Sequence, residues 1–395
     1  MKILFLTTNS LATNPRLYKE ILLAKQSGFL PKVICFEFNN WSKEINEALI
    51  TKLNGVEVIS IPAGRSPYFI WFRSVVTETV FRIMGKFISL PLPALSQAVS
   101  RRSNLIIETL DKVSKADWVI GHNPGAIWPA LSAAKKFNCK VGFDVEDYHA
   151  GEGHNKYIQS LTRKLMVATL PKMNYVSFAS PLIMQRVKAD MKFDKGNWFV
   201  VLNYFPISDF KVPISLIKEP AKMVWFSQNI NAGRGLELIL PFVKKANGKV
   251  ELHLVGNLDT GFYEKCLKGI SNIIIHPPMP QNELHHSLDN YDIGLALEPA
   301  KDVNNQLAIS NKIMAYLQAG LFIMATNTPA QETLLKDLPG HGVCIDYRND
   351  NAELVFEKTL TELNVIRGQR TMRYKSFENR NWETVSMDLL TEWNR

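Results

Sequence analysis

Cysteine is scarce in this chain, and its few copies are scattered. None of the four cysteines belongs to a Cys-X-X-Cys pair: Cys35, Cys139, Cys266 and Cys344. This spacing argues against a zinc finger or a disulfide framework and is typical of buried thiols in a reducing compartment. Long apolar runs are also absent, so no segment has the length of a membrane-spanning helix. The first ten residues hold one lysine and an apolar run too short for a signal peptide. We therefore expect a cytoplasmic protein.

Acidic residues are outnumbered by basic ones. The chain has 46 lysines and arginines against 37 acidic residues, a formal net charge of +9. A basic surface can serve nucleic acid, anionic lipid or phosphorylated small molecules. Because we find no zinc spacing, no RNP-like aromatic motif and no reliable helix-turn-helix pattern, we expect no nucleic-acid partner.

Short apolar strands alternate with helical patterns along the chain. The 46% hydrophobic and 21% charged residues indicate a globular protein, and 395 residues are enough for two domains. Strands that are apolar on both faces and separated by helices predict a parallel sheet covered on both sides, hence an α/β fold. In the first half we expect strands at Ile3–Thr7, Lys32–Phe38, Val56–Ile61, Trp118–Gly121, Lys140–Asp144, Tyr175–Ala179 and Trp198–Leu202.

The pattern restarts after a proline-containing segment, Asn203–Lys222, which we interpret as a linker. New strands are expected at Met223–Ser227, Val250–Val255, Asn272–Ile275, Asp292–Leu297, Phe322–Ala325 and Gly342–Ile345. We therefore predict an N-terminal domain over residues 1–205 and a C-terminal domain over 206–378. An amphipathic helix is expected over 379–395. Two open sheets in sequence place ligands at their carboxyl edges, where the strand order reverses.

Residues 66–102 interrupt this alternation. Aromatic and aliphatic side chains are dense there, basic residues punctuate them, and Glu78 is the one acid. One interpretation is a pair of helices that pack on the first domain with their basic residues in water. The other is an interfacial helix that contacts an anionic membrane, which would make the protein peripheral on the inner face of the cell membrane.

A capped helix follows the strand at Asp292–Leu297. Ser310 stands where an N-cap belongs, Lys312 lies in the first turn, and Gly320 closes the helix. Free N–H groups at a helix N-terminus bind anions, and a lysine beside them strengthens such a site. The segment is either a diphosphate site or an ordinary strand-loop-helix unit.

Two polar loops of the first domain are further candidates. In the first, Asn14 caps a helix that Pro15 begins, and Arg16 follows in its first turn. The second loop follows the strand at Lys140–Asp144 and is dense in acids and histidines, among them Glu146, Asp147 and His149. Such residues could supply a general base or bind a divalent ion. A capped helix with a solvent arginine and a solvated acidic loop are the alternatives.

The chain resembles GT-B-fold glycosyltransferases and is most similar to glycosyltransferase family 4. The resemblance runs from Thr13–Glu20 to Trp382-Glu383 and includes the Asn311-Lys312 pair and Arg234-Gly235. It implies two Rossmann-like domains that face a cleft, with a nucleotide-diphosphate-sugar donor on the C-terminal domain. The acceptor, a lipid-linked or polysaccharide hydroxyl, would lie on the N-terminal domain, to which the last helix returns. It also implies retention at the anomeric carbon without a metal.

The resemblance also assigns residues. His122, Glu146, Asp147 and His149 would serve the acceptor or the transferred sugar; if the enzyme inverts instead, Asp147 or His149 is the candidate base. The donor would be bound by residues of several loops: Asn14, Arg16, Asn229, Arg234, Gly256, Glu298, Ser310, Asn311 and Lys312. Asn229 stands where the family has a basic residue.

Two family glutamates are absent. Leu307 and Ala315 occupy their positions, so either Glu298, Asn304 or Asn305 replaces the sugar contact, or the donor differs, or the protein is a weak enzyme. The departure leaves two other functions open. One is a nucleotide-sugar epimerase of similar fold, and the other is a non-catalytic family member that binds a glycan or a partner glycosyltransferase.

Overall fold

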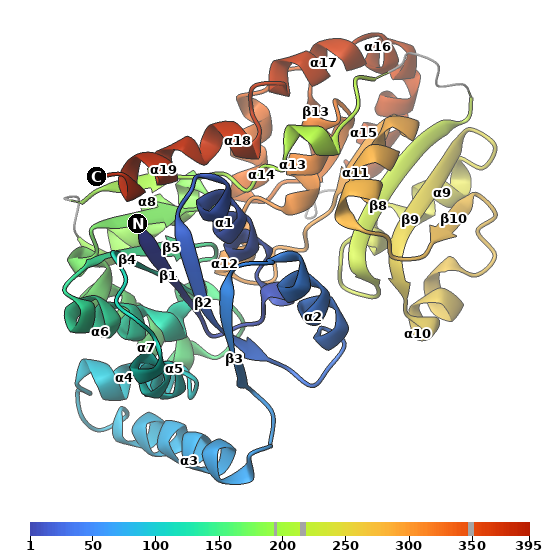
Figure 1. Ribbon diagram of the computed structural model, residues 1–395. Coiled ribbons are helices and arrows are strands. Elements are labelled where there is room, and N and C mark those ends of the chain that lie inside the picture. Colours follow the sequence, from blue (N-terminus) through green and yellow to red (C-terminus); the bar gives the residue numbers. More distant parts are fainter. Residues whose placement is uncertain (193–195, 214–218, 347–350) are drawn as a thin grey trace. The chain divides into compact units, whose positions relative to one another are not determined.

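A computed structural model describes residues 1–192, 196–213, 219–346 and 351–395. The chain divides into two compact units (Figure 1). Unit 1 comprises Met1–Leu202 together with Asp388–Arg395, and unit 2 comprises Asn203–Met387. Residues 214–218 of the expected linker lie outside the described residues.

Unit 1 is built on a seven-stranded parallel sheet in the order β3-β2-β1-β4-β5-β6-β7. Its strands are β1 (Lys2–Thr7), β2 (Leu30–Glu37), β3 (Glu57–Pro62), β4 (Trp118–His122), β5 (Lys140–Val145), β6 (Tyr175–Phe178) and β7 (Trp198–Val200). Its helices are α1 (Pro15–Gln26), α2 (Lys43–Lys52), α3 (Tyr68–Met84), α4 (Leu92–Val99), α5 (Ser103–Thr109), α6 (Ile127–Phe137), α7 (Lys156–Thr169) and α8 (Pro181–Met191). The expected α/β architecture is confirmed.

Unit 2 repeats this plan with a six-stranded parallel sheet in the order β10-β9-β8-β11-β12-β13. Its strands are β8 (Ala221–Ile230), β9 (Val250–Leu258), β10 (Ile273–His276), β11 (Ile293–Ala296), β12 (Phe322–Thr326) and β13 (Gly342–Ile345). Its helices include α9 (Leu240–Lys245), α10 (Thr260–Phe262), α11 (Gln281–Ser287), α12 (Val303–Leu307), α13 (Asn311–Gln318), α14 (Pro329–Lys336), α15 (Ala352–Thr361), α16 (Leu363–Gly368) and α17 (Arg370–Phe377).

Burial explains why these strands are apolar on both faces. Strand β1 is buried along all but its first residue, and β4, β11 and β12 are buried throughout. Helices pack on the sheets, so a strand in the middle of either sheet has no wet face that would tolerate alternating polar residues. Because the strands of each sheet are parallel, their carboxyl ends lie at one edge of that sheet.

The strand order reverses once in each sheet. In unit 1 the chain runs outward from β1 through β2 to β3, and then returns to pair β4 with the other side of β1. In unit 2, β8 stands in the same way between β9 and β11. Loops leave such a switch point in opposite directions, which opens a crevice where open α/β sheets bind ligands.

The segment 66–102 forms two helices of unequal burial. Helix α4 buries Ala94, Leu95, Ser96 and Ala98, and its Leu95 packs in a cluster with residues of α7. In α3, by contrast, the one buried residue is Ser74. Most of the apolar side chains of α3 are therefore exposed. No helix in the described ranges is long and apolar enough to cross a bilayer.

The C-terminal segment differs from the single helix expected over residues 379–395. It forms α18 (Trp382–Val385) and α19 (Met387–Trp393), which meet at Ser386. Asn381 caps α18 by accepting a hydrogen bond from the Thr384 amide. In unit 1, the Trp393 indole donates to the Tyr175 hydroxyl over 3.0 Å, and its ring packs edge-on against Phe5. The burial of Trp393 thus holds the chain end on the first sheet.

Candidate functional site

Four polar residues form a row across the carboxyl ends of four neighbouring strands in unit 1. Thr7 of β1 is in register with His122 of β4, His122 with Asp144 of β5, and Asp144 with Ser177 of β6. All four side chains are buried. Since neighbours in register share a face of the sheet, this row creates a polar interior beside the switch point.

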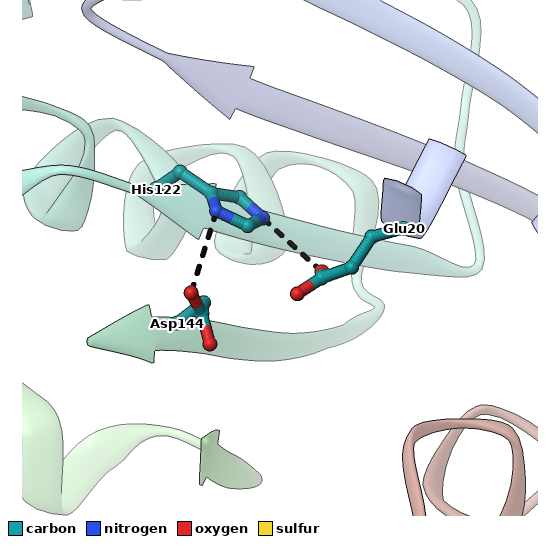
Figure 2. A group of neighbouring side chains, drawn as sticks. All are labelled: Glu20, His122 and Asp144. Carbon is teal, nitrogen blue, oxygen red and sulfur yellow. Dashed lines mark hydrogen bonds and ion pairs between the residues drawn. The ribbon is translucent and has the colours of Figure 1, made fainter. Parts of the chain in front are cut away.

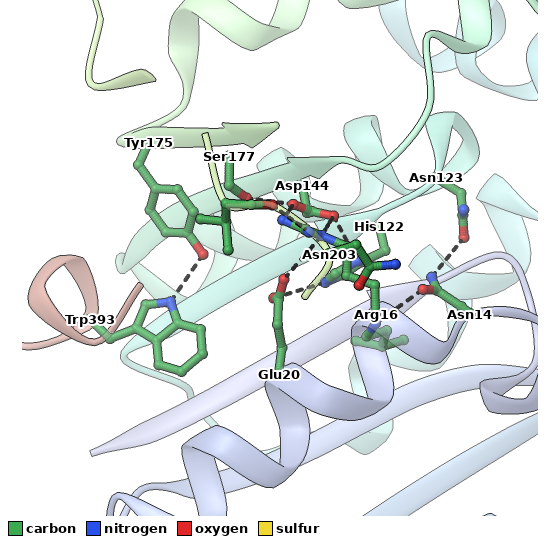
Figure 3. Close-up of polar contacts among 12 residues, drawn as sticks. Asn14, Arg16, Glu20, His122, Asn123, Asp144, Tyr175, Ser177, Asn203 and Trp393 are labelled. Atoms are coloured by element: carbon green, nitrogen blue, oxygen red, sulfur yellow. Dashed lines mark hydrogen bonds and ion pairs between the residues drawn. The ribbon is translucent and has the colours of Figure 1, made fainter. Parts of the chain in front are cut away.

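Helix α1 covers this row with two charged residues. Asn14 accepts a hydrogen bond from the Leu17 amide, and Pro15 begins the helix, as the sequence predicts. Arg16 and Glu20 then stand one turn apart, on the same helix face. Their side chains point at the row (Figure 3).

Arg16 forms the strongest contact of this group. Its Nε and Nη2 donate to the two carboxylate oxygens of Asp144 over 2.7 and 2.8 Å, and its Nη1 donates to the Val201 carbonyl over 2.7 Å. Ser177 donates to the same carboxylate over 2.6 Å. Burial opposes the charge on Asp144, but Arg16, His122 and these hydrogen bonds prevail and lower its pKa. For Arg16 the attraction of Asp144 likewise outweighs burial and raises the pKa.

His122 lies between two carboxylates (Figure 2). Its Nε2 is 3.2 Å from a Glu20 oxygen and its Nδ1 is 3.7 Å from an Asp144 oxygen. Burial by itself would lower the pKa of His122, yet the charge and hydrogen bond of Glu20 and the charge of Asp144 raise it. Glu20, His122 and Asp144 offer ligand atoms that all lie within 4.8 Å of one another. Among the described residues, this is the group of His, Cys, Asp and Glu side chains that could hold a metal ion. The Asp144 carboxylate, however, already has the Arg16 guanidinium as its cationic partner.

The acidic loop after β5 lies next to this cluster. Glu146 is partly buried, and burial, together with the charges of Asp147 and Asp144, raises its pKa to about 7. Asp147 is partly buried too. His149 Nδ1 lies 3.0 Å from a Glu152 oxygen; burial would lower the pKa of His149, but Glu152 and Asp147 raise it. The loop thus holds a carboxyl group, that of Glu146, which titrates near neutral pH.

Three residues predicted to meet substrate are instead inside unit 1. Asn14 and Arg16 have no exposed surface and His122 has 1%. The expectation that Arg16 points from the first turn toward donor phosphates is therefore not met, because a buried guanidinium in a carboxylate pair cannot present its donors to a ligand. These side chains instead connect the loops at the carboxyl edge of the first sheet.

Sequence reasoning missed Glu20 and Asn123. Glu20 has the i, i+4 spacing from Arg16 that could have revealed it. Asn123 follows His122 with φ +68° and ψ 150°, a backbone region that favours glycine, and its Oδ1 accepts from Thr7 and Asn14. A strained residue of this kind at a switch point marks a backbone that the surrounding contacts hold in place.

In unit 2 the start of α13 lies at the end of β11. Ser310 is the N-cap and accepts from the Ile313 amide over 3.4 Å, as the sequence predicts. Lys312 Nζ lies 2.7 Å from a Glu298 oxygen and 5.8 Å from the centre of the Trp225 ring. Asn311 is exposed, and its Oδ1 accepts a hydrogen bond from the side-chain Nδ2 of Asn203 over 2.8 Å. The first-turn amides of α13 have no carbonyl of their own helix to bond.

A second basic loop follows β8. Arg234 donates from Nε to Asn231 over 2.8 Å and from Nη1 to Ser227 over 2.9 Å, and among the described contacts no hydrogen bond uses its Nη2. Gly233 and Gly235 on either side have φ of +71° and +91°. A Cβ on Gly233 would lie 3.4 Å from Lys301 Nζ. The exposed Lys301, which sequence reasoning missed, is therefore a further cation beside the loop.

The remaining donor candidates have different surroundings. A Cβ on Gly256, where φ is +150°, would lie 2.1 Å from the Ser227 carbonyl, so β8 itself requires this glycine. Asn229 is exposed at the end of β8, in register with Asn257 of β9. Of the two positions where the family has glutamates, Leu307 is partly buried and Ala315 is fully buried. A carboxylate at position 315 would thus lie in the interior.

Solved structures share this fold across the whole chain. Sucrose-phosphate synthase from Thermosynechococcus elongatus matches with a TM-score of 0.68 at 11% identity, covering 100% of this chain and 98% of that one. Anabaena HepE in complex with UDP matches at 0.65 and 12%, covering 100% of both. A putative UDP-N-acetylglucosamine 2-epimerase from Listeria monocytogenes matches at 0.56 and 12%, covering 94% and 90%. No family model matches the chain, and neither does any curated protein. These similarities establish the GT-B fold, with two parallel α/β sheets whose strand order each reverses once.

Proposed function

We propose that this protein is a glycosyltransferase that moves a sugar from a nucleotide-diphosphate donor to a hydroxyl of a lipid-linked or polysaccharide precursor. The observation that carries the proposal is the set of three cations on the segments that follow β8 and β11, the strands at the switch point. Arg234 follows β8, and Lys301 and Lys312 follow β11. Cations and helix N-terminal amides at one edge match the charge of a diphosphate leaving group.

Each group of this edge has a role in donor binding. Arg234 is held by Asn231 and Ser227, which leaves Nη2 for a phosphate oxygen. Lys301 supplies the charge that Asn229 lacks. Lys312 exchanges Glu298 for a phosphate oxygen, and the released Glu298 accepts hydrogen bonds from sugar hydroxyls. Sugar recognition by Glu298 then compensates for the carboxylates absent at Leu307 and Ala315.

The acceptor is served by the acidic loop of unit 1. Asp147 and His149 orient the acceptor hydroxyl, and Glu146, whose pKa is raised to about 7, lies on the same loop. The reaction retains the anomeric configuration and takes its driving force from neutralisation of the leaving diphosphate. Nuclear magnetic resonance of the product distinguishes retention from inversion.

Catalysis needs no metal in this proposal. A cation bound by Glu20, His122 and Asp144 would have to displace the buried guanidinium of Arg16 from the Asp144 carboxylate. This displacement would break a buried ion pair and is therefore unfavourable. Activity is expected to survive chelation by EDTA. Loss of activity on chelation, with recovery on adding a divalent ion, would contradict this part of the proposal.

Radiolabelled nucleotide sugars, incubated with and without lipid extract, test the function. UDP-sugars are the first donors to try, because HepE is described in complex with UDP. We expect label to enter the lipid or polymer fraction with the wild type and not with an Arg234→Ala/Lys312→Ala variant. Conversion of the donor sugar without acceptor would instead identify an epimerase. Nucleotide binding with no turnover of any donor would identify the non-catalytic function, which the absence of glutamates at Leu307 and Ala315 favours.

A further inference from the structure

Helix α3 carries an apolar stripe that faces solvent. Phe69, Phe72, Val76, Val80 and Ile83 follow at spacings of three and four residues, which confines them to roughly 80° of the helix circumference at about 100° per residue. All five side chains are exposed, Phe69 by 74%. In Figure 1, α3 lies at the periphery of unit 1, beyond α4 and α5. The stripe is thus one continuous apolar surface.

The fold does not need this surface. On the inner side of α3, Ser74 is buried, Phe81 packs against the cluster of α4 and α7, and Arg82 Nε donates to the Ala98 carbonyl over 2.8 Å. The stripe continues beyond the end of the helix at Gly85, where Phe87 is 80% exposed and Ile88 is exposed as well. Contiguous exposed apolar side chains of this kind mark a binding surface.

Basic residues flank the stripe. Residues 65–102 hold six arginines and lysines and one acid, Glu78, which is paired with Arg82. Arg65 and Lys86 flank the helix and are exposed, and each lies over an aromatic ring, that of Trp71 and that of Tyr157 respectively. The partner of this surface must therefore be both apolar and negatively charged.

We propose that α3 and the following turn, residues 65–88, dock the protein on an anionic membrane. The helix would lie in the plane of the interface with its stripe among the acyl chains and Arg65 and Lys86 at the headgroups. A second copy of the chain would bring basic residues against basic residues. A polyanion would leave the phenylalanines without an apolar partner. The lipid bilayer satisfies both requirements.

The segment is also anchored to the carboxyl edge of the first sheet. Arg102, at its end, donates to the Thr8 carbonyl just beyond β1 over 2.9 Å. Through α4 and the Arg102 contact, a membrane bound to α3 is connected to the switch point of unit 1. Docking does not rest on glycosyl transfer, because vesicle binding is measured without donor or acceptor.

Flotation of the full chain with vesicles tests the proposal. Vesicles of phosphatidylcholine alone are compared with vesicles that also contain phosphatidylglycerol, at low and high salt. We expect binding to the anionic vesicles at low salt and weaker binding at high salt, because screening shortens the reach of Arg65 and Lys86. The variant Phe69→Ser/Phe87→Ser should lower the partition coefficient at least about tenfold.

Matched variants keep the test specific. Leu354→Ser/Val365→Ser removes two exposed apolar residues from unit 2, and Lys52→Glu/Lys336→Glu reverses two exposed lysines elsewhere. Vesicle binding by both control variants should stay close to that of the wild type. Binding by Phe69→Ser/Phe87→Ser and by Arg65→Glu/Lys86→Glu should be weaker. The proposal is overturned if stripe and control variants lose binding equally, or if the wild type ignores anionic vesicles. A wild-type dimer that the Phe69→Ser/Phe87→Ser variant splits, without vesicle binding, would assign the stripe to a second copy instead.

Discussion

The Arg16 guanidinium and the Asp144 carboxylate form a two-point ion pair in the interior of unit 1, between residues 128 positions apart in the sequence. The pair connects the first turn of α1 to β5, and it also brings in Val201 through the third guanidinium nitrogen. It is therefore a contact on which the geometry of the first switch point depends.

Breaking this pair on one side should destabilise the protein strongly. Asp144→Asn removes the two-point partner of the buried Arg16 and leaves only Glu20, 3.9 Å away, so the free energy of unfolding should fall by about 3–5 kcal/mol. Urea denaturation measures the loss. Asp111→Asn, which breaks the exposed pair with Lys136, is the control and should have no measurable effect. Equal effects of the two substitutions would show that the buried pair has no special weight.

Removing the cations of unit 2 should weaken binding of UDP. Arg234→Ala and Lys312→Ala each delete a charge-assisted contact and should cost on the order of 1.5–3 kcal/mol of binding free energy. Lys301→Ala should cost less, because its ammonium group is exposed. Calorimetry measures the affinities, with Lys268→Ala as the control. Unchanged affinity in both Arg234→Ala and Lys312→Ala would remove the diphosphate assignment.

Glu298 should affect the binding of free UDP and of UDP-sugar differently. In the structure its carboxylate holds Lys312, so Glu298→Gln should free the ammonium group and tighten UDP binding. The same variant should weaken UDP-sugar relative to UDP, because a sugar contact is lost. Competition calorimetry gives the ratio of the two affinities. A parallel change for both ligands would mean that Glu298 does not contact the sugar.

The acidic loop of unit 1 should govern transfer and leave donor binding unchanged. Asp147→Ala and His149→Ala are each expected to lower the transfer rate, by roughly 10²–10⁴-fold for an acid/base and by less for an orienting residue. Radiolabel transfer and UDP calorimetry are measured on the same preparations. Equal losses of donor affinity and rate, or a lowered melting temperature, would indicate a donor-binding or structural loop.

Glu146 should make stability depend on pH. Its folded-state pKa of about 7 lies above the ordinary carboxyl value, so the folded protein holds a proton that the unfolded chain releases. Its contribution to stability therefore falls as pH rises from about 4.5 to 7. Glu146→Gln should stabilise the protein at pH 8 relative to wild type by on the order of 1 kcal/mol, and have little effect at pH 4. Melting curves at the two pH values measure this difference, and the same effect at both would contradict the raised pKa.

Much of the fold could be predicted from local sequence. Apolar strands between helical patterns predicted the two parallel sheets, since only a sheet covered on both faces makes both sides of a strand apolar. The helix caps at Asn14 and Ser310 could also be predicted, because a capping side chain bonds a backbone amide in the first turn of the helix that it begins. Signals of this kind involve residues only a few positions apart.

Contacts between distant residues were decided by tertiary structure alone. Strand register placed Thr7, His122, Asp144 and Ser177 in one buried row, and the packing of α1 on that row turned Arg16 from an apparent ligand contact into an interior ion pair. The exposed stripe of α3 is of the same kind: an apolar helix face has the same sequence whether it meets a protein core or solvent. Sequence periodicity determines which residues share a face, and only the packing of elements far apart in the chain determines what that face contacts.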